Sequence, residues 1–437
     1  MKGTWVFDTI VNELHHCFEK LPDYRTGENI QYEIKDAALS AFGVFFTQSA
    51  SFLSYQRLLN KGRNGSNLER MFRVERIPSD NQIRNLLDPL EPGMLAEVFA
   101  RSMEELGAMG ILDKFRSYDG RLLISVDGTQ TVSSQKVSCE NCSTRKLANG
   151  ETHYAHPAIL PVIVKAGESR VLVLEPEFIT PQDGHEKQDC ERAAIKRWVA
   201  GNKETFGKRN CTILGDDLYS CQPLCELFLD TGFSFILVCK PDSHIALYEQ
   251  VDFLAKTGVV EQFSTRHWNG RYAEISQYRY VNSVPLRRGE DALSVNWCEI
   301  TITREDTGRR LYHNTFITNT LLDEGNVKLI VRDGRARWKS ENETNNVLKT
   351  KGYHLEHNFG HGQHSLANFL TTLNLLAFLL HTLLDLLDEA YKMLRKDLVV
   401  RTEFFNDLRT LLRYMHFDSW NHLMRFMLIN LELIPDT

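Results

Sequence analysis

Three acidic residues lie far apart along the chain, at positions from which they could bind divalent cations together. Asp127 ends the apolar run LLISVD, and Asp216 ends a second apolar run, CTILGD. A lone carboxylate beside a buried strand is costly unless it is paired or bound to a metal. Glu341 follows Arg337 by four residues in a stretch that predicts a helix, so both side chains would lie on one helix face. Carboxylates that meet at Mg²⁺ suit the cleavage and transfer of phosphodiesters by two metal ions.

The elements that must position these acids follow an order typical of an α/β core. From residue 121, short runs rich in Val, Ile and Leu predict three successive strands: RLLISVD, AILPVIVK and RVLVLEPEFI. A helix over KQDCERAAIKRWVAG, a strand at CTILGDD, a helix over SCQPLCELFLDTG and a strand at FSFILVCK follow. The order is therefore β β β α β α β, with Asp127 on the first strand, Asp216 on the fourth and Glu341 on a later helix.

Helical and strand-rich segments surround this core. Residues 1–118 carry apolar side chains at mixed spacings of three and four, which predicts a small helical domain, and Ser79 is the expected N-cap of one of its helices. Residues 246–321 favour strands joined by charged turns, and residues 366–437 are helical. The core then comprises residues 119–245 and 322–365.

The acid-bearing motifs resemble those of a known family. The segments VDGT (126–129), GDDLY (215–219) and RWKSE (337–341) are similar to motifs of the DDE transposases of bacterial insertion sequences, in the cut-and-paste branch with a β-rich insertion before the glutamate. The similarity runs from about residue 70 to 365. It implies an α/β fold with an RNase H-like mixed sheet, in which the first and fourth strands are neighbours. The insertion would be residues 246–321, and residues 1–118 would bind DNA or mediate dimerisation.

The family motifs also distinguish the acids from their acidic neighbours. The second motif reads aspartate, two variable residues and tyrosine, so it selects Asp216 with Tyr219 and leaves Asp217 in a variable position. The third motif reads arginine, tryptophan, two residues and glutamate. It passes over Glu343 and selects three residues: Arg337, Trp338 and Glu341.

The resemblance implies a set of DNA contacts. Arg337 would contact the DNA backbone, and Trp338 would stack on a displaced base, an interaction worth about 1 to 3 kcal/mol. Where the signature has a phosphate-binding lysine, this chain has Leu348, and Lys349 comes one residue later, about 80° round a regular helix. The signature tyrosine before the arginine is replaced by Gly334. The expected DNA-binding residues are Arg335, Arg337, Trp338, Lys349 and Tyr219.

The activity implied by the resemblance is DNA transposition. Asp127, Asp216 and Glu341 would bind two Mg²⁺ ions, with Mn²⁺ tolerated; water would nick the transposon end, and the released 3′-hydroxyl would attack target DNA. The implied partners are the transposon's terminal inverted repeats and target DNA, bound by a homodimer. Two alternatives remain: a non-catalytic DNA-binding protein derived from a transposase, against which the three retained acids argue, and a metal-dependent nuclease that cuts without joining.

Cysteines and histidines between the first two predicted strands could bind zinc. Cys139 and Cys142 form a Cys-x-x-Cys pair, and after ten residues His153 and His156 form a His-x-x-His pair. Tetrahedral zinc accepts two thiolates and two imidazoles, so this set would form a structural site. The alternative, which strand geometry favours, is a reduced hairpin with ordinary thiols, because a β-strand would send His153 and His156 to opposite faces.

A second histidine-rich segment, LEHNFGHGQH, lies beyond the glutamate helix. It places His357, His361 and His364 around two glycines. Clustered imidazoles can bind transition metals, but this position predicts a helix boundary that contacts DNA or fixes the loop.

Residues 366–387 are long and apolar enough to cross a bilayer. Polar residues interrupt the stretch at four positions: Asn368, Asn374, His381 and Asp385. We therefore expect a buried core helix and no association with a membrane.

Composition indicates a cytoplasmic protein, and the resemblance to transposases implies association with the bacterial nucleoid. Nine cysteines scattered over 437 residues do not suggest a disulfide framework, which favours a reducing compartment. A net charge of −6 gives no overall attraction for DNA, so binding must depend on local basic patches. One such group surrounds the third acid: Arg332, Arg335, Arg337 and Lys339. DNA binding through this group should weaken steeply with salt.

Overall fold

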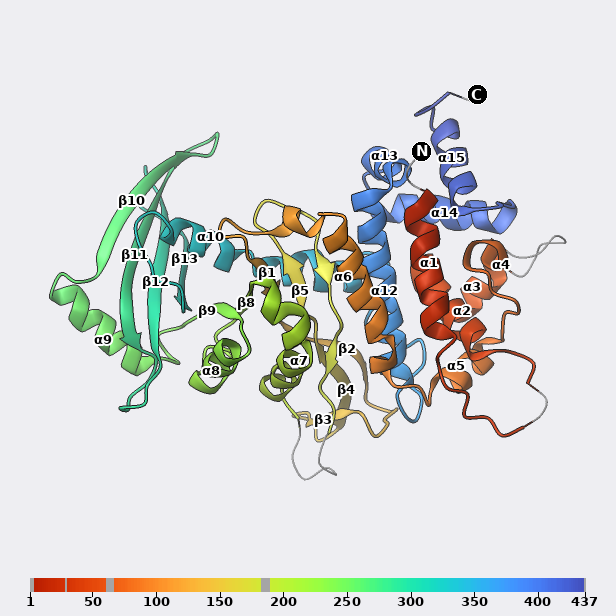
Figure 1. The fold of residues 1–437 in the computed structure, drawn as a ribbon, viewed down its shortest axis with the longest axis horizontal. Coiled ribbons are helices and arrows are strands. Elements are labelled where there is room, and N and C mark those ends of the chain that lie inside the picture. The colour runs from red at the N-terminus through yellow and green to blue at the C-terminus, as the bar shows by residue number, and fades with distance from the viewer. Residues whose placement is uncertain (1–3, 28–29, 60–66, 182–188, 436–437) are drawn as a thin grey trace.

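The molecule extends from a helical body, through a central sheet, to a strand-rich lobe at the opposite end (Figure 1). The computed structural model describes residues 4–27, 30–59, 67–181 and 189–435. The fold is mixed α/β, with parallel and antiparallel strands in one large sheet and helical regions from both ends of the chain. This agrees with the mixed α/β sheet and the helical flanking regions expected from the sequence.

Five short buried strands form one side of the large sheet, in the order β6-β5-β1-β8-β9, with β6 at the edge. Their bounds are β1 (Leu122–Ser125), β5 (Val162–Val164), β6 (Leu172–Val173), β8 (Cys211–Gly215) and β9 (Ser234–Val238). β1 pairs antiparallel with β5 and parallel with β8, and β8 pairs parallel with β9. All five are buried along their whole length. The predicted order of strands and helices is thus present, with the first and fourth predicted strands side by side.

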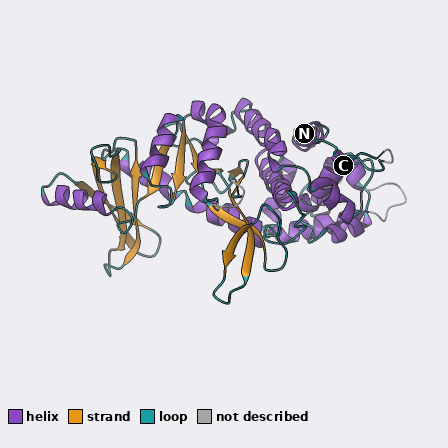
Figure 2. Ribbon diagram, turned by 90° about the horizontal axis from the view of Figure 1, so that it is seen from below, coloured by secondary structure: helices purple, strands orange, loops and turns teal. Residues whose placement is uncertain are grey.

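The predicted second and third strands are each divided between two sheets. AILPVIVK supplies the end of β4 (Thr152–Ile159) and all of β5, with Pro161 between them, and RVLVLEPEFI supplies β6 and β7 (Glu177–Phe178), with Pro176 between them. Proline has no N–H to continue a ladder, so each run stops and changes sheet at its proline. Together with β2 (Gly128–Ser134) and β3 (Ser143–Lys146), these segments form a small sheet in the order β2-β4-β3, in which β7 also pairs with β4. It projects from the middle of the molecule (Figure 2).

The strand-rich segment 246–321 continues the central sheet. It contains β10 (Glu261–Trp268), β11 (Ala273–Pro285), β12 (Ser294–Arg304) and β13 (Arg310–Thr318), after the helix α9 (Ile245–Lys256). β13 pairs antiparallel with β9, so the whole sheet has nine strands. This lobe lies at the end of the molecule opposite the helical body (Figure 1).

Helices next to the sheet carry the remaining residues of interest. They are α7 (Glu191–Phe206), α8 (Gln222–Asp230) and α10 (Val327–Arg335). A π-helical turn (Ser340–Asn345) and α11 (Asn346–Thr350) continue the path of α10. At Gly334, α10 packs closely on the sheet: a Cβ there would lie 2.8 Å from Cε1 of Phe316 and 2.9 Å from Cγ2 of Ile236. This packing leaves no room for the tyrosine that the family signature has at this position.

The helices from the two ends of the chain form one body. The N-terminal set is α1 (Thr4–Phe18), α2 (Ile34–Phe46), α3 (Phe52–Leu59), α4 (Asn67–Phe72), α5 (Asp80–Leu87) and α6 (Ala96–Ala108). The C-terminal set is α12 (Leu366–Leu387), α13 (Glu389–Asp397), α14 (Arg401–Tyr414) and α15 (Trp420–Asn430), and short 3₁₀ turns span Pro92–Leu95, Leu112–Phe115 and Gly207–Arg209. Ser79 caps α5 through a capping box with Gln82, as expected.

Helix α12 is the core of the helical body. It contacts α1 and α2 (Figure 1), and 83% of its most apolar 18-residue stretch is buried inside the protein. In the part of the chain that the structure describes, it is the one helix long and apolar enough to cross a membrane. Two of its polar side chains bond to backbone inside the protein: His381 Nε2 to the Phe46 carbonyl at 2.8 Å, and Asn374 Nδ2 to the Tyr353 carbonyl at 2.8 Å. The expected core helix is therefore confirmed.

Candidate functional site

Two of the predicted acids leave the same edge of the central sheet. Asp127 follows β1 by two residues, and Asp216 directly follows β8. The parallel register pairs Ser125 with Leu214, and the Val126 N–H bonds the Leu214 carbonyl at 2.9 Å. Because the carboxyl ends of parallel strands lie together, the two aspartates emerge as neighbours at the place where α/β sheets commonly bind ligands.

The third predicted acid, Glu341, interacts with Asp127 through its charge. Burial raises the pKa of Asp127 to about 6; the Arg337 guanidinium opposes this shift, and the carboxylates of Asp216, Glu341 and Glu191 add to it. The charges of the other two predicted acids, Asp216 and Glu341, thus both act on Asp127, and so does the charge of a fourth acid, Glu191. The structure also places Arg337 among them as the opposing positive charge.

Glu191 was not singled out from the sequence. It is the first residue of α7, and its carboxylate lies over Gly128, where a Cβ would be only 2.3 Å from its Cδ. The Tyr219 hydroxyl donates to its Oε2 at 3.1 Å. Burial raises the pKa of Glu191, the Tyr219 hydrogen bond lowers it, and the charge of Asp216 raises it further. The signal available in the sequence was an acid in the first turn of the helix that follows the three predicted strands.

The helix that carries Glu341 is irregular. Glu341 is solvent-exposed within the single π-turn, which holds one residue more than an α-turn and is often found at functional sites. The 80° offset expected for Lys349 assumed a regular helix, and the extra residue reduces it. Leu348, in the signature lysine position, is fully buried. The Lys349 ammonium pairs with Glu356 at 3.0 Å.

The acidic neighbours of the predicted acids have other partners. Asp217 accepts the Lys240 N–H at 2.6 Å and the Ser243 hydroxyl, so it holds the chain after β9. Glu343 lines a separate cleft. Asp217 and Glu343 therefore have surroundings that differ from those of the two acids selected by the motifs.

The expected DNA-binding residues occupy different environments. Tyr219 is fully buried and faces Glu191, so in this structure it has no surface to offer to DNA. Trp338 is 47% exposed, with the Lys339 ammonium 4.7 Å from its ring centroid. Arg335 is exposed and stacks on Tyr312 at 4.3 Å.

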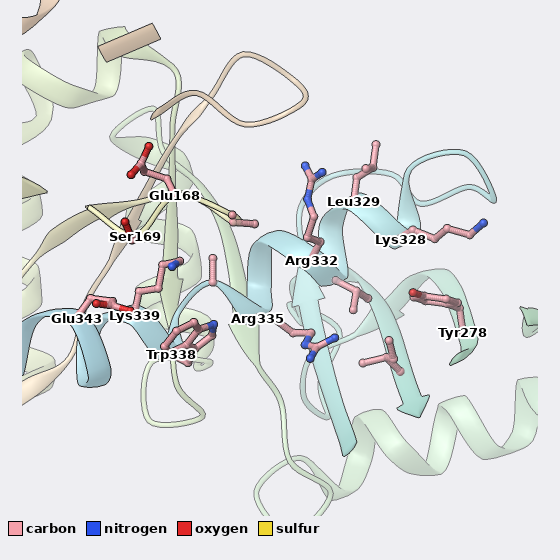
Figure 3. A pocket seen from close by; sticks show the side chains of 15 residues that line it. Glu168, Ser169, Tyr278, Lys328, Leu329, Arg332, Arg335, Trp338, Lys339 and Glu343 are labelled. Carbon is pink, nitrogen blue, oxygen red and sulfur yellow. The ribbon is translucent and has the colours of Figure 1, made fainter. Parts of the chain in front are cut away.

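A basic cleft of about 590 Å³ runs beside α10. Figure 3 shows the side chains that give it its character: Lys328, Arg332, Arg335, Lys339 and Trp338. The loop Ala166–Ser169 and residues of β11 and β12 complete its walls. None of the four clustered acids is among its lining residues. The cleft is therefore a neighbouring surface, reached along the same helical segment that carries Arg337 and Glu341.

A second cluster consists of Cys139, Cys142, His156 and His361, which could hold a metal ion. Their four potential ligand atoms lie within 4.8 Å of one another. The predicted set was right for three members and wrong for His153. On β4, His153 pairs with Arg145 and lies an odd number of residues from His156, so it points to the opposite face. The place of His153 is taken by His361, for which we had expected a helix-boundary role.

The other two histidines of that segment stay outside the cluster. His364 Nδ1 lies 3.0 Å from Oε1 of Glu140, and His357 packs edge-on against Phe359. The segment LEHNFGHGQH thus supplies one cluster member, and its remaining histidines fix the loop.

Comparison of the sequence with known proteins finds no matching family model and no significantly similar curated protein. Function must therefore be inferred from these residues and their geometry.

Proposed function

We propose that the protein is a DDE-type DNA transposase with an RNase H-like core, which nicks transposon ends and joins them to target DNA by two-metal-ion phosphoryl transfer. The observation that carries the proposal is that Asp127 and Asp216 follow adjacent parallel strands, while the charges of Asp216 and Glu341, both distant in sequence, act on Asp127. Each of the other two is close enough to raise the pKa of Asp127. The adjacency of β1 and β8 within a mixed sheet supports the RNase H-like part of the proposal.

The chemistry of the donor set fits Mg²⁺. Mg²⁺ prefers carboxylate oxygens, and the site offers four carboxylates against one guanidinium, that of Arg337. Negative charge in excess at a partly buried site favours a divalent cation. Asp127, Asp216 and Glu341 would hold two ions, which when bound supply a Lewis acid and an activated water for displacement at phosphorus.

The chain's own residues orient the nucleic acid. Arg337, beside the carboxylates, binds a DNA phosphate and keeps the scissile bond near them, because a guanidinium can make two parallel hydrogen bonds to a phosphate. Trp338, the next residue, is exposed and can stack on a base. The buried Tyr219 does not bind phosphate in this scheme. It holds Glu191 over Gly128, the residue that follows Asp127.

The basic cleft extends the same surface. Lys328, Arg332, Arg335 and Lys339 present positive charge along α10 and the turn after it (Figure 3). Net charge is −6, so this local group would provide the attraction for the DNA backbone. Binding through several phosphate contacts releases counterions, and the affinity should fall steeply as salt is raised.

The test uses a duplex carrying the DNA that flanks the gene, incubated with the protein and Mg²⁺. Asp127→Asn and Asp216→Asn should each reduce strand nicking at least about 100-fold, because each removes a charged metal ligand. The matched control is Asp217→Asn, whose carboxylate is engaged elsewhere and whose nicking should stay within about threefold of wild type. Equal nicking by wild type and Asp127→Asn would refute the proposed site.

The products separate the two alternatives. Joined DNA products support the transposase, whereas cleavage without joining identifies a metal-dependent nuclease. Mg²⁺-independent DNA binding without cleavage identifies a non-catalytic DNA-binding protein.

A further inference from the structure

We propose that Cys139, Cys142, His156 and His361 form a closed tetrahedral zinc site that joins the small β-sheet to the helical body. The proposal is independent of the acidic site, since it shares no residue with it. Two thiolates and two neutral imidazoles balance the charge of one Zn²⁺ and leave no position open for a substrate. The site is therefore structural.

Five of the six distances between the ligand atoms are those expected for a zinc tetrahedron. The two sulfurs are 3.8 Å apart, His156 Nε2 is 3.4 Å from each sulfur, and the two imidazole Nε2 atoms are 3.3 Å apart. His361 Nε2 lies 3.2 Å from the Cys142 sulfur. Bond lengths of about 2.3 Å to sulfur and 2.05 Å to nitrogen give tetrahedral edges of about 3.8, 3.6 and 3.3 Å for S–S, S–N and N–N pairs. All five distances agree with these edges within about 0.4 Å.

The surroundings prepare the ligands for a metal. His156 Nδ1 lies 2.8 Å from the Asn368 amide oxygen, so Nδ1 carries the proton and Nε2 is left with its lone pair toward the cluster. Cys142, His156 and His361 are each at most 5% exposed. A disulfide would bring the two sulfurs to about 2.05 Å, far closer than they are, so both thiols remain free to bind.

The four ligands come from three separate parts of the chain. The two cysteines flank the turn between β2 and β3, His156 lies on β4, and His361 lies in the loop before α12. Asn141, inside the turn, bonds the His364 carbonyl at 3.1 Å and the Ser365 hydroxyl at 3.3 Å. The loop is in turn held by Asp88, after α5, which accepts the N–H groups of Gln363, His364 and Leu366.

This arrangement indicates what the zinc stabilises. β2 starts at Gly128, directly after Asp127, and its Val132 pairs with His156. The zinc would therefore anchor one end of the β2–β4 ladder to α12, while the other end leads into the acidic site. Removal of the metal should loosen the contact between the small sheet and the helical body.

The test measures metal content and thermal unfolding of the purified full-length protein, with no DNA present. Wild type should contain about one zinc per chain, and chelation should lower its unfolding midpoint, with recovery when Zn²⁺ is added back. His361→Ala and Cys142→Ser should lose the zinc. Asn368→Ala, which removes only the partner of a ligand, should weaken zinc binding about 10- to 100-fold.

Two variants serve as controls. His153→Ala lies on the same strand but faces away from the cluster, so it should retain the zinc. Asp127→Asn should also retain it, and this separates a failure of zinc binding from a failure of the proposed nicking activity. The proposal is overturned if reduced wild-type protein contains no zinc and is not stabilised by added Zn²⁺, or if His153→Ala loses zinc while His361→Ala keeps it. If His361→Ala does not fold, the Asn368→Ala titration and chelation of wild type decide.

Discussion

Replacing Gly334 by alanine tests how α10 is seated on the sheet, and with it the position of Arg337 and Glu341. An added Cβ would lie 2.8 and 2.9 Å from two ring carbons of Phe316 and 2.9 Å from a methyl of Ile236. These side chains are only 1% and 4% exposed, so neither can move aside into solvent. Either the helix retreats from the sheet or the two side chains leave their preferred rotamers.

The magnitude follows from two opposing effects. Overpacking of a buried contact costs about 1 to 3 kcal/mol. Glycine-to-alanine substitution in a helix interior recovers up to about 1 kcal/mol of helix propensity, and less near a helix end such as position 334. We therefore expect Gly334→Ala to lower the free energy of unfolding by about 1 to 2 kcal/mol.

The matched control is Gly201→Ala. Gly201 is exposed within α7, and a Cβ there would meet no atom within 4 Å. Its substitution should stabilise the protein by about 0.5 to 1 kcal/mol, because only the propensity effect remains. Urea unfolding followed by circular dichroism should separate the two variants by about 2 kcal/mol. If Gly334→Ala proves as stable as Gly201→Ala, α10 does not pack on the sheet as described.

Two further predictions concern the acidic site and the helical core. Glu191→Gln keeps the shape of the side chain and a hydrogen bond to Tyr219 but removes one negative charge. The Mg²⁺ concentration needed for half-maximal nicking should therefore rise about 10-fold. Gly128→Ala, which would displace the same carboxylate, should act in the same direction, and an unchanged Mg²⁺ dependence in both variants would exclude Glu191 from the site. Burial lowers the pKa of His381 from 6.5 to about 3. Below pH 6.5 the unfolded chain therefore binds a proton that the folded chain does not. The free energy of unfolding should fall by up to about 1.4 kcal/mol per pH unit down to about pH 3. His381→Gln removes this pH dependence. The stability advantage of wild type over the variant, measured by urea unfolding, should therefore shrink between pH 6.5 and 4. A constant difference would contradict a buried neutral imidazole.

The element order and the two aspartates followed from local sequence. An apolar run that ends in a carboxylate predicts the end of a buried strand, and β1 and β8 end next to Asp127 and Asp216. Ser79 predicts a helix start, and the structure shows that it caps α5 through hydrogen bonds that span three residues. Each of these features depends on side chains within one turn or one strand, so the sequence contains the necessary information.

Other boundaries were predicted less well because they depend on more than the apolar pattern. The runs around Pro161 and Pro176 read as single strands, but each is shared by two sheets. The segment around Glu341 reads as a regular helix, but it contains a π-turn. In both cases the pattern of apolar residues continues without a break. The backbone hydrogen bonds, however, change from one sheet to another in the strands, and from α-helical to π-helical spacing in the helix.

Only the tertiary structure decided which distant residues meet. His361 joins His156 across 205 residues of sequence, and Glu191 reaches the aspartates because Gly128 leaves space for its carboxylate. The N-terminal and C-terminal helices, which read as separate regions, share the core around α12. Local periodicity determines what each segment becomes, because helix and strand form from near neighbours. Which faces come into contact depends on packing over the whole chain, and no short window of sequence contains that information.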